Sequence, residues 1–117
     1  MMYALLMYTD PAHTRAMDEQ ALAIVARKHE ALRNELGASG ELSGGAGLAF
    51  PDETTVLRLG PGGVDARQGP LITDMTEQLS AYYEVECETP ERAQEIAAHV
   101  LDDHVVAVEV RRIHDTA

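Results

Sequence analysis

The segment Gln68–Tyr83, QGPLITDMTEQLSAYY, joins a tight turn to the start of an alternating strand. Gly69-Pro70 predicts the turn, because glycine accepts backbone conformations closed to other residues and proline cannot continue a strand. Beyond it, alternation predicts a strand from Ala81 to Cys87 with one buried face and one face at a wet rim. The first face carries Tyr83, Val85 and Cys87, and the second carries Tyr82, Glu84 and Glu86.

A helix and a last strand are expected downstream of this strand. Thr89 can cap the helix, Pro90 suits its first position, and the segment Asp102-Asp103-His104 closes it. The Val-rich segment from Val105 to Ile113 predicts the last strand, followed by a frayed tail from His114 to Ala117. The apolar stripe of the helix comprises Ala93, Ile96, Ala97, Val100 and Leu101.

Upstream, the pattern predicts a strand, a helix, a second strand and a hairpin. Met2–Tyr8 is apolar on both faces, as in a central strand covered on both sides, and Asp10-Pro11 ends it. Asp18 can cap a helix that stops at Gly37. A short irregular strand follows Gly40, and the hairpin has strands Thr54–Leu59 and Val64–Arg67 around a glycine-rich turn. The helix stripe comprises Leu22, Val25, His29, Leu32 and Leu36.

The element order predicts an α+β fold with the ferredoxin-like βαββαβ plan and an extra β-hairpin, in a single domain spanning residues 1–117. Two helices can cover only one face of such a sheet. Because the first and last strands are apolar on both faces, the uncovered face needs a partner, and a second copy of the chain is the simplest one. We therefore expect a homodimer with facing sheets.

The chain resembles the YCII-related, or DGPF-domain, family of small bacterial proteins. The resemblance rests on Gly69-Pro70, Glu77-Gln78-Leu79, Tyr82-Tyr83 and the closing segment Val108–Ile113. Gln68 and Leu71 stand where the family signature has Asp and Phe. Membership would imply a dimeric α+β barrel and homodimer formation.

The resemblance also implies an active site built from a His-Asp pair. The family carries an Arg-x-x-His-x-x-Leu pattern in its first helix, and the His-x-x-Leu part matches at His29 and Leu32. Asp102 and Asp103 correspond roughly to the family's acidic residues after the second helix. The implied catalytic residues are His29 with Asp102 or Asp103.

The residues themselves also single out His29, which occupies a helix position where an apolar side chain would ordinarily face the sheet. Such an imidazole needs a hydrogen-bonding partner, and it could be poised for proton transfer or serve as a structural core histidine. Tyr82 and Tyr83 point to opposite faces, so one belongs to the core and the other could line a substrate-binding cleft. The glycine-rich run around Gly45 could allow close packing of the chain or form a flexible pocket wall.

The amino-acid composition limits the kinds of molecule that the chain is expected to bind. Twenty acidic and nine basic residues leave a formal charge of −11, which disfavours nucleic acid and anionic membranes. The lone Cys87 cannot form an internal disulfide, and the apolar start lacks a basic leader, so a cytoplasmic location is expected. No metal is predicted, because His99, Asp103 and His104 form only a loose group of ligand types. No cofactor is expected either.

The sequence leaves more than one function open. The chain is either a cofactor-independent enzyme, a lyase or hydrolase in which His29 and Asp102 or Asp103 act as acid and base, or a non-enzymatic ligand-binding or regulatory module. A purely structural dimer is a third reading. The enzyme reading requires a carboxylate within about 2.6–3.2 Å of His29, or one water away, inside an open pocket.

Overall fold

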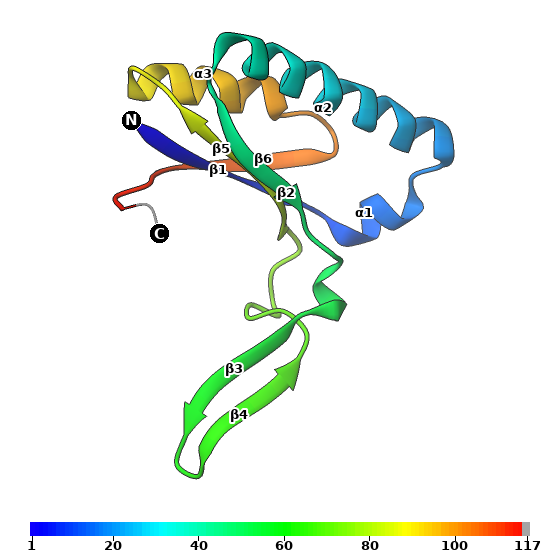
Figure 1. The fold of residues 1–117 in the computed structure, drawn as a ribbon. Coiled ribbons are helices and arrows are strands. Elements are labelled where there is room, and N and C mark those ends of the chain that lie inside the picture. Colours follow the sequence, from blue (N-terminus) through cyan, green and yellow to red (C-terminus); the bar gives the residue numbers. More distant parts are fainter. Residues whose placement is uncertain (116–117) are drawn as a thin grey trace.

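A computed structural model describes residues 1–115 and shows a mixed α+β architecture (Figure 1). The expected tail lies partly outside this range, at residues 116 and 117. In chain order the elements are β1 (Met2–Thr9), α1 (Pro11–Ala16), α2 (Glu19–Ser39), β2 (Leu42–Gly47), the 3₁₀ turn η1 (Pro51–Glu53), β3 (Thr55–Gly60), β4 (Gly63–Gln68), β5 (Gln78–Glu86), α3 (Pro90–Val100) and β6 (Val105–Arg112).

Four strands form one antiparallel sheet in the order β2-β5-β1-β6. Helices α2 and α3 lie on the same side of this sheet, and within residues 1–115 no helix lies on its other side (Figure 1). Within residues 1–115 the sheet remains open at β2 and β6 and does not close into a barrel. The expectation that the helices cover only one face is confirmed.

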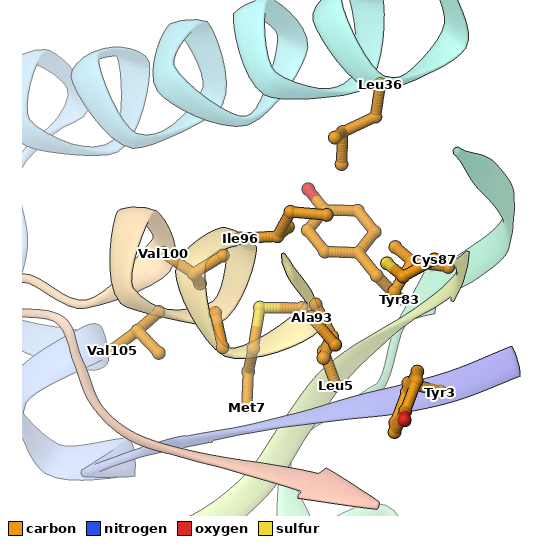
Figure 2. Close-up of a cluster of buried hydrophobic side chains, with 12 residues drawn as sticks. Tyr3, Leu5, Met7, Leu36, Tyr83, Cys87, Ala93, Ile96, Val100 and Val105 are labelled. Carbon is orange, nitrogen blue, oxygen red and sulfur yellow. The ribbon is translucent and has the colours of Figure 1, made fainter. Parts of the chain in front are cut away.

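The core lies between this sheet and α3 (Figure 2). Alternate residues of β1 are buried, from Tyr3 to Thr9, and on β5 the predicted face of Tyr83 and Val85 is buried as well. The helix stripe of α3 is confirmed except at its end, because the helix stops at Val100 and Leu101 is 47% exposed. The buried residues of α3 are Ala93, Ile96, Ala97 and Val100.

Helix α2 begins as predicted and ends later. The Asp18 carboxylate accepts a hydrogen bond from the Ala21 N–H at 2.8 Å, which satisfies one of the free donors at the helix start. The predicted stop at Gly37 is wrong, because Gly40, with φ of 78°, is the left-handed cap. A glycine can continue a helix at modest cost, and Gly37 does so here.

The stripe predicted along α2 is buried only at its C-terminal end. Leu36 is 1% exposed and points toward the core, whereas Leu22 is 43% exposed. Between them, Val25, His29 and Leu32 are half-buried. The N-terminal part of α2 therefore does not seal against the sheet, and this leaves room for a cavity.

The helix-free face is less apolar than predicted. Its central strand β1 places half-buried Met2, Ala4, Leu6 and Tyr8 there. On β6, however, Glu109 and Arg111 pair with Leu6 and Ala4, so charged side chains occupy this face. The sequence predicted that the first and the last strand are apolar on both faces. This prediction is confirmed for β1 and wrong for β6.

The predicted hairpin exists as a separate two-stranded sheet of β3 and β4, here called the arm. It extends away from the body of the molecule (Figure 1). Its base is closed by the Gly69 N–H, which donates to the Thr54 carbonyl at 2.7 Å, and by the Gln68 side chain, which donates to the Asp52 carbonyl at 2.9 Å. Gly69 has φ of 106°, which explains the glycine at this turn.

Candidate functional site

A cavity of about 870 Å³ lies between helices α1 and α2 and the part of the sheet formed by β2 and β5. Its volume falls within the usual range for small-molecule pockets, roughly 300–1,000 Å³. Apolar side chains such as Met7, Val25 and Leu42 form much of the wall, and the polar groups come from five elements and from the segment before β6. The polar lining includes Thr9, Thr14, His29, Arg33, Glu53, Gln78, Ser80, Tyr83 and His104.

His29 and Tyr83 meet at this wall. His29 Nδ1 lies 2.7 Å from the Tyr83 hydroxyl, within hydrogen-bonding distance. Tyr83 is 5% exposed, and its ring stands on the helix side of the sheet among the core residues (Figure 2). The tyrosine is therefore held by packing, and its hydroxyl fixes the position of a half-buried imidazole.

Burial favours the neutral form of both groups. It lowers the pKa of His29, with further lowering from the positive charges of Lys28 and Arg33, while Asp102 opposes the change. Burial raises the pKa of Tyr83, and nearby Arg33 acts in the opposite direction. Near neutral pH the pair is thus an uncharged imidazole beside an uncharged phenol.

This pair can present either a donor or an acceptor to a ligand. If the Tyr83 hydroxyl donates to Nδ1, the proton of the neutral imidazole is on Nε2, which then acts as a donor. If Nδ1–H donates to the tyrosine oxygen, Nε2 carries a lone pair and can accept a proton. The arrangement therefore suits both hydrogen-bonding recognition and proton transfer.

Asp102, one of the two predicted catalytic carboxylates, is occupied by structural contacts. Its Oδ1 accepts from the backbone N–H groups of His104 at 2.8 Å and Val105 at 2.7 Å. Its Oδ2 accepts from Lys28 Nζ at 2.7 Å. Burial acts to raise the pKa of Asp102, but these hydrogen bonds outweigh it and the pKa is lowered.

Lys28 also explains how an acidic residue is tolerated after α3. Its Nζ donates to the Val100 carbonyl at 3.0 Å as well as to Asp102, so it serves the free carbonyls at the helix end. A cation there balances the negative end of the helix dipole. The negative charge of Asp102 beside the helix end is thus neutralised by Lys28 of α2.

The predicted His-Asp pair is not assembled in the structure. Among the hydrogen bonds of residues 1–115, none joins His29 to Asp102 or to Asp103. Asp103 is exposed and does not line the cavity. The partner that sequence reasoning sought in a carboxylate is the hydroxyl of Tyr83.

The predicted substrate-binding residues lie along the cavity wall. Gly45 pairs with Tyr83 between β2 and β5, and a Cβ at Gly45 would come within 2.6 Å of the Tyr82 carbonyl oxygen and 2.9 Å of the Tyr83 ring. Tyr82 pairs with Leu6, on the opposite face of the sheet from Tyr83. Tyr83, not Tyr82, therefore brings its hydroxyl to His29.

Most polar residues of the cavity lining were not predicted from sequence, among them Arg33, His104 and Thr14. Arg33 stands four residues after His29, on the same face of α2, and this spacing could have identified it. His104 also lines the cavity, and its Nδ1 lies 3.5 Å from the Thr14 hydroxyl. Burial lowers the pKa of His104, although Asp102 opposes this effect.

Helix α1, also unpredicted, forms one rim of the cavity. Asp10, expected only to end β1, caps this helix by accepting from the Ala12 N–H at 3.0 Å. Arg15 holds the neighbouring segment, because its guanidinium lies 3.9 Å from the centre of the Phe50 ring and 3.0 Å from the Asp52 carboxylate. The cavity rim thus links α1 to the base of the arm.

Residues 1–115 contain no group of three or more His, Cys, Asp or Glu side chains placed to hold a metal ion. In the same range, every helix is too short or too polar to cross a lipid bilayer. Comparison with protein families found no family model that matches the sequence, and a search of curated proteins returned no match.

Proposed function

We propose that this chain binds a small organic molecule in the cavity beneath α2. The observation that carries the proposal is the His29–Tyr83 pair, 2.7 Å apart, at the wall of a mainly apolar cavity of about 870 Å³. A few convergent polar groups in an apolar pocket are the usual form of a ligand site. The absence of a carboxylate hydrogen-bonded to His29 in residues 1–115 favours binding over the predicted His-Asp catalysis.

The proposal can be tested by blocking the cavity. Val25 lines it, whereas Ile24, on the same helix, is 54% exposed and does not. A mixture of small aromatic and aliphatic compounds should shift the NMR signals of His29, Tyr83 and Gly45 in the native protein. Val25→Trp should abolish these shifts and Ile24→Trp should leave them. Shifts that survive Val25→Trp would place binding elsewhere and refute the proposal.

A second candidate, acid–base catalysis without a cofactor, is favoured by one specific feature of the pair. Burial keeps the imidazole of His29 neutral near pH 7, so that Nε2 can accept a proton in one tautomer, with Tyr83 holding the ring. The test is exchange of C–H protons of a bound compound in heavy water, followed by NMR. His29→Gln should slow this exchange by roughly 10²-fold or more.

The control for this test is His99→Gln, because His99 is exposed on α3 and does not line the cavity. Equal exchange in the native protein and in His29→Gln would reject catalysis by His29. Binding that persists in His29→Gln without exchange would support it. Binding with no exchange in any variant would leave the chain a ligand-binding module.

We also propose that the fold is ferredoxin-like and that the chain belongs to the YCII-related family in a cytoplasmic setting. The sheet order β2-β5-β1-β6 and the two helices on one face support the βαββαβ plan. The family assignment rests on the signature residues alone. Gln68 and Gly69 of that signature close the base of the arm, which gives the segment a structural role.

A homodimer through the helix-free face completes this proposal. Half-buried Leu6 and Tyr8 lie on that face, where a facing sheet would shield them. Sedimentation equilibrium should detect the dimer, and Leu6→Lys should dissociate it without unfolding the chain. Ala31→Lys, at an exposed position on α2, is the matched control. A native protein that remains monomeric at high concentration would rule this interface out.

A further inference from the structure

The charges around the cavity differ from those of the rest of the chain. Overall the chain carries twenty acidic and nine basic residues. The residues that line the cavity include one carboxylate, Glu53, and one guanidinium, Arg33, together with the imidazoles of His29 and His104. The cavity is therefore much poorer in negative charge than the surface around it.

Arg33 is an exposed charged residue close to the Tyr83 hydroxyl. It follows His29 by one helical turn, lines the cavity, and acts on the Tyr83 hydroxyl closely enough to oppose the rise of its pKa. Within residues 1–115, no ion pair is found for Arg33, and the same holds for Arg27, Arg58, Arg67 and Arg112, whereas Arg15, Lys28 and Arg92 each bind a carboxylate. Among these five arginines without an ion pair, Arg33 is the one that lines the cavity, so its guanidinium is available to a ligand there.

We infer that the cavity binds an organic carboxylate, whose carboxylate group pairs with Arg33 beside the His29–Tyr83 pair and whose apolar body lies against Met7, Val25 and Leu42. This inference rests on the proposed function and specifies its ligand class. The planar guanidinium matches a carboxylate with two parallel hydrogen bonds. One arginine, with Tyr83 and His29 neutral beside it, suits a single negative charge.

The remainder of the wall fits the same ligand. The apolar side chains lie on the sheet and on α2 and can cover an aromatic or alicyclic ring. In the same lining, His104 and the Thr14 hydroxyl can form hydrogen bonds with a second polar substituent. Glu53 belongs to η1, on the side of the cavity that leads to the arm, rather than to the helix that carries Arg33.

The experiment compares benzoate and 2-naphthoate with their neutral amides, by calorimetry and by NMR shifts of His29 and Tyr83. The carboxylates should bind at least about tenfold more tightly than the amides, the difference expected when a charge-assisted hydrogen-bonded pair is lost. Arg33→Gln should remove this preference. Arg27→Gln is the matched control, because Arg27 lies on the same helix and outside the cavity lining.

The outcomes separate the two proposals. Amides that bind in the cavity as tightly as the carboxylates would overturn the inference and leave the proposed ligand site standing. Equal weakening by Arg27→Gln and Arg33→Gln would also overturn it, because a general charge effect would then explain the preference. No shift at His29 or Tyr83 with any of the four compounds would contradict both the inference and the proposed function for this class of compound.

Discussion

Tyr83 packs its ring into the core while its hydroxyl contacts His29 at the cavity wall. Strand alternation predicted correctly that Tyr82 and Tyr83 lie on opposite faces, but it could not show that one residue serves both core and site. His29, Tyr83 and Gly45, all chosen from sequence, do line the cavity. That Asp102 binds Lys28 rather than His29 could not be predicted, because this contact joins residues far apart in the chain.

At the residue scale, we expect the pKa of His29 to lie below its ordinary value near 6.5. Asp102→Asn should lower it further, since the negative charge of Asp102 favours the protonated ring, and Lys28→Gln should raise it. Because the folded pKa is lowered, this histidine reduces the stability of the fold as the pH falls through 6.5. An NMR titration of the histidine ring protons measures these values, and a pKa above 6.5 would contradict the burial described here.

Gly45 provides a second prediction at this scale. A methyl group at this position would collide with the Tyr82 carbonyl and the Tyr83 ring, so Gly45→Ala should lower the free energy of unfolding by about 1–3 kcal/mol. It should also disturb the NMR signal of His29. Gly47→Ala, in the same strand with no atom within 4 Å of the added Cβ, should change stability by less than about 0.5 kcal/mol. Chemical denaturation compares the two, and equal losses would argue against the close contact.

At the scale of elements, caps were predictable and helix lengths were not. Asp18 and Thr89 each accept the backbone hydrogen bond expected of a helix cap. Helix α2, however, passes through Gly37 to Gly40, since a glycine ends a helix only where the chain needs the left-handed conformation. Helix α1 was missed because its first residue, Pro11, was interpreted from sequence only as a strand breaker.

Helix α2 is buried only near its C-terminal end, and this leads to a prediction about the stability of the fold. Leu36 is its one buried residue, so Leu36→Ala should cost about 2–4 kcal/mol in unfolding free energy. Leu22→Ala, at a position 43% exposed, should cost less than about 1 kcal/mol although the same side-chain atoms are removed. Urea denaturation of both variants measures the contrast. Similar costs would show that the N-terminal half of α2 packs against the sheet after all.

At the scale of the whole molecule, the four-stranded sheet and the arm are distinct in their packing. The arm forms its own two-stranded sheet, and Leu57, Leu59 and Val64 on it are 64%, 86% and 69% exposed. An isolated hairpin is marginally stable in water. The sequence predicted the hairpin from its turn residues, but alternation could not show that neither of its faces meets the core.

Removal of the arm tests this separation. Replacing residues 55–68 with a short glycine-serine turn should leave the helix content unchanged and alter the unfolding free energy by less than about 1 kcal/mol, since Thr54 and Gly69 already meet. Circular dichroism and denaturation provide the measurement. Loss of folding would show that the arm supports the sheet. A change in sedimentation alone would assign the exposed leucines to contact between copies.

The hydrogen bond between Gly69 and Thr54 allows the sequence of the arm to change independently of the cavity. Since the polypeptide leaves and re-enters the body at a single point, residues can be gained, lost or exchanged beyond that point without moving the walls that hold His29 and Tyr83. The glycine-flanked tip at Gly60–Gly63 is thus a natural place to graft a foreign epitope or a fluorescent label.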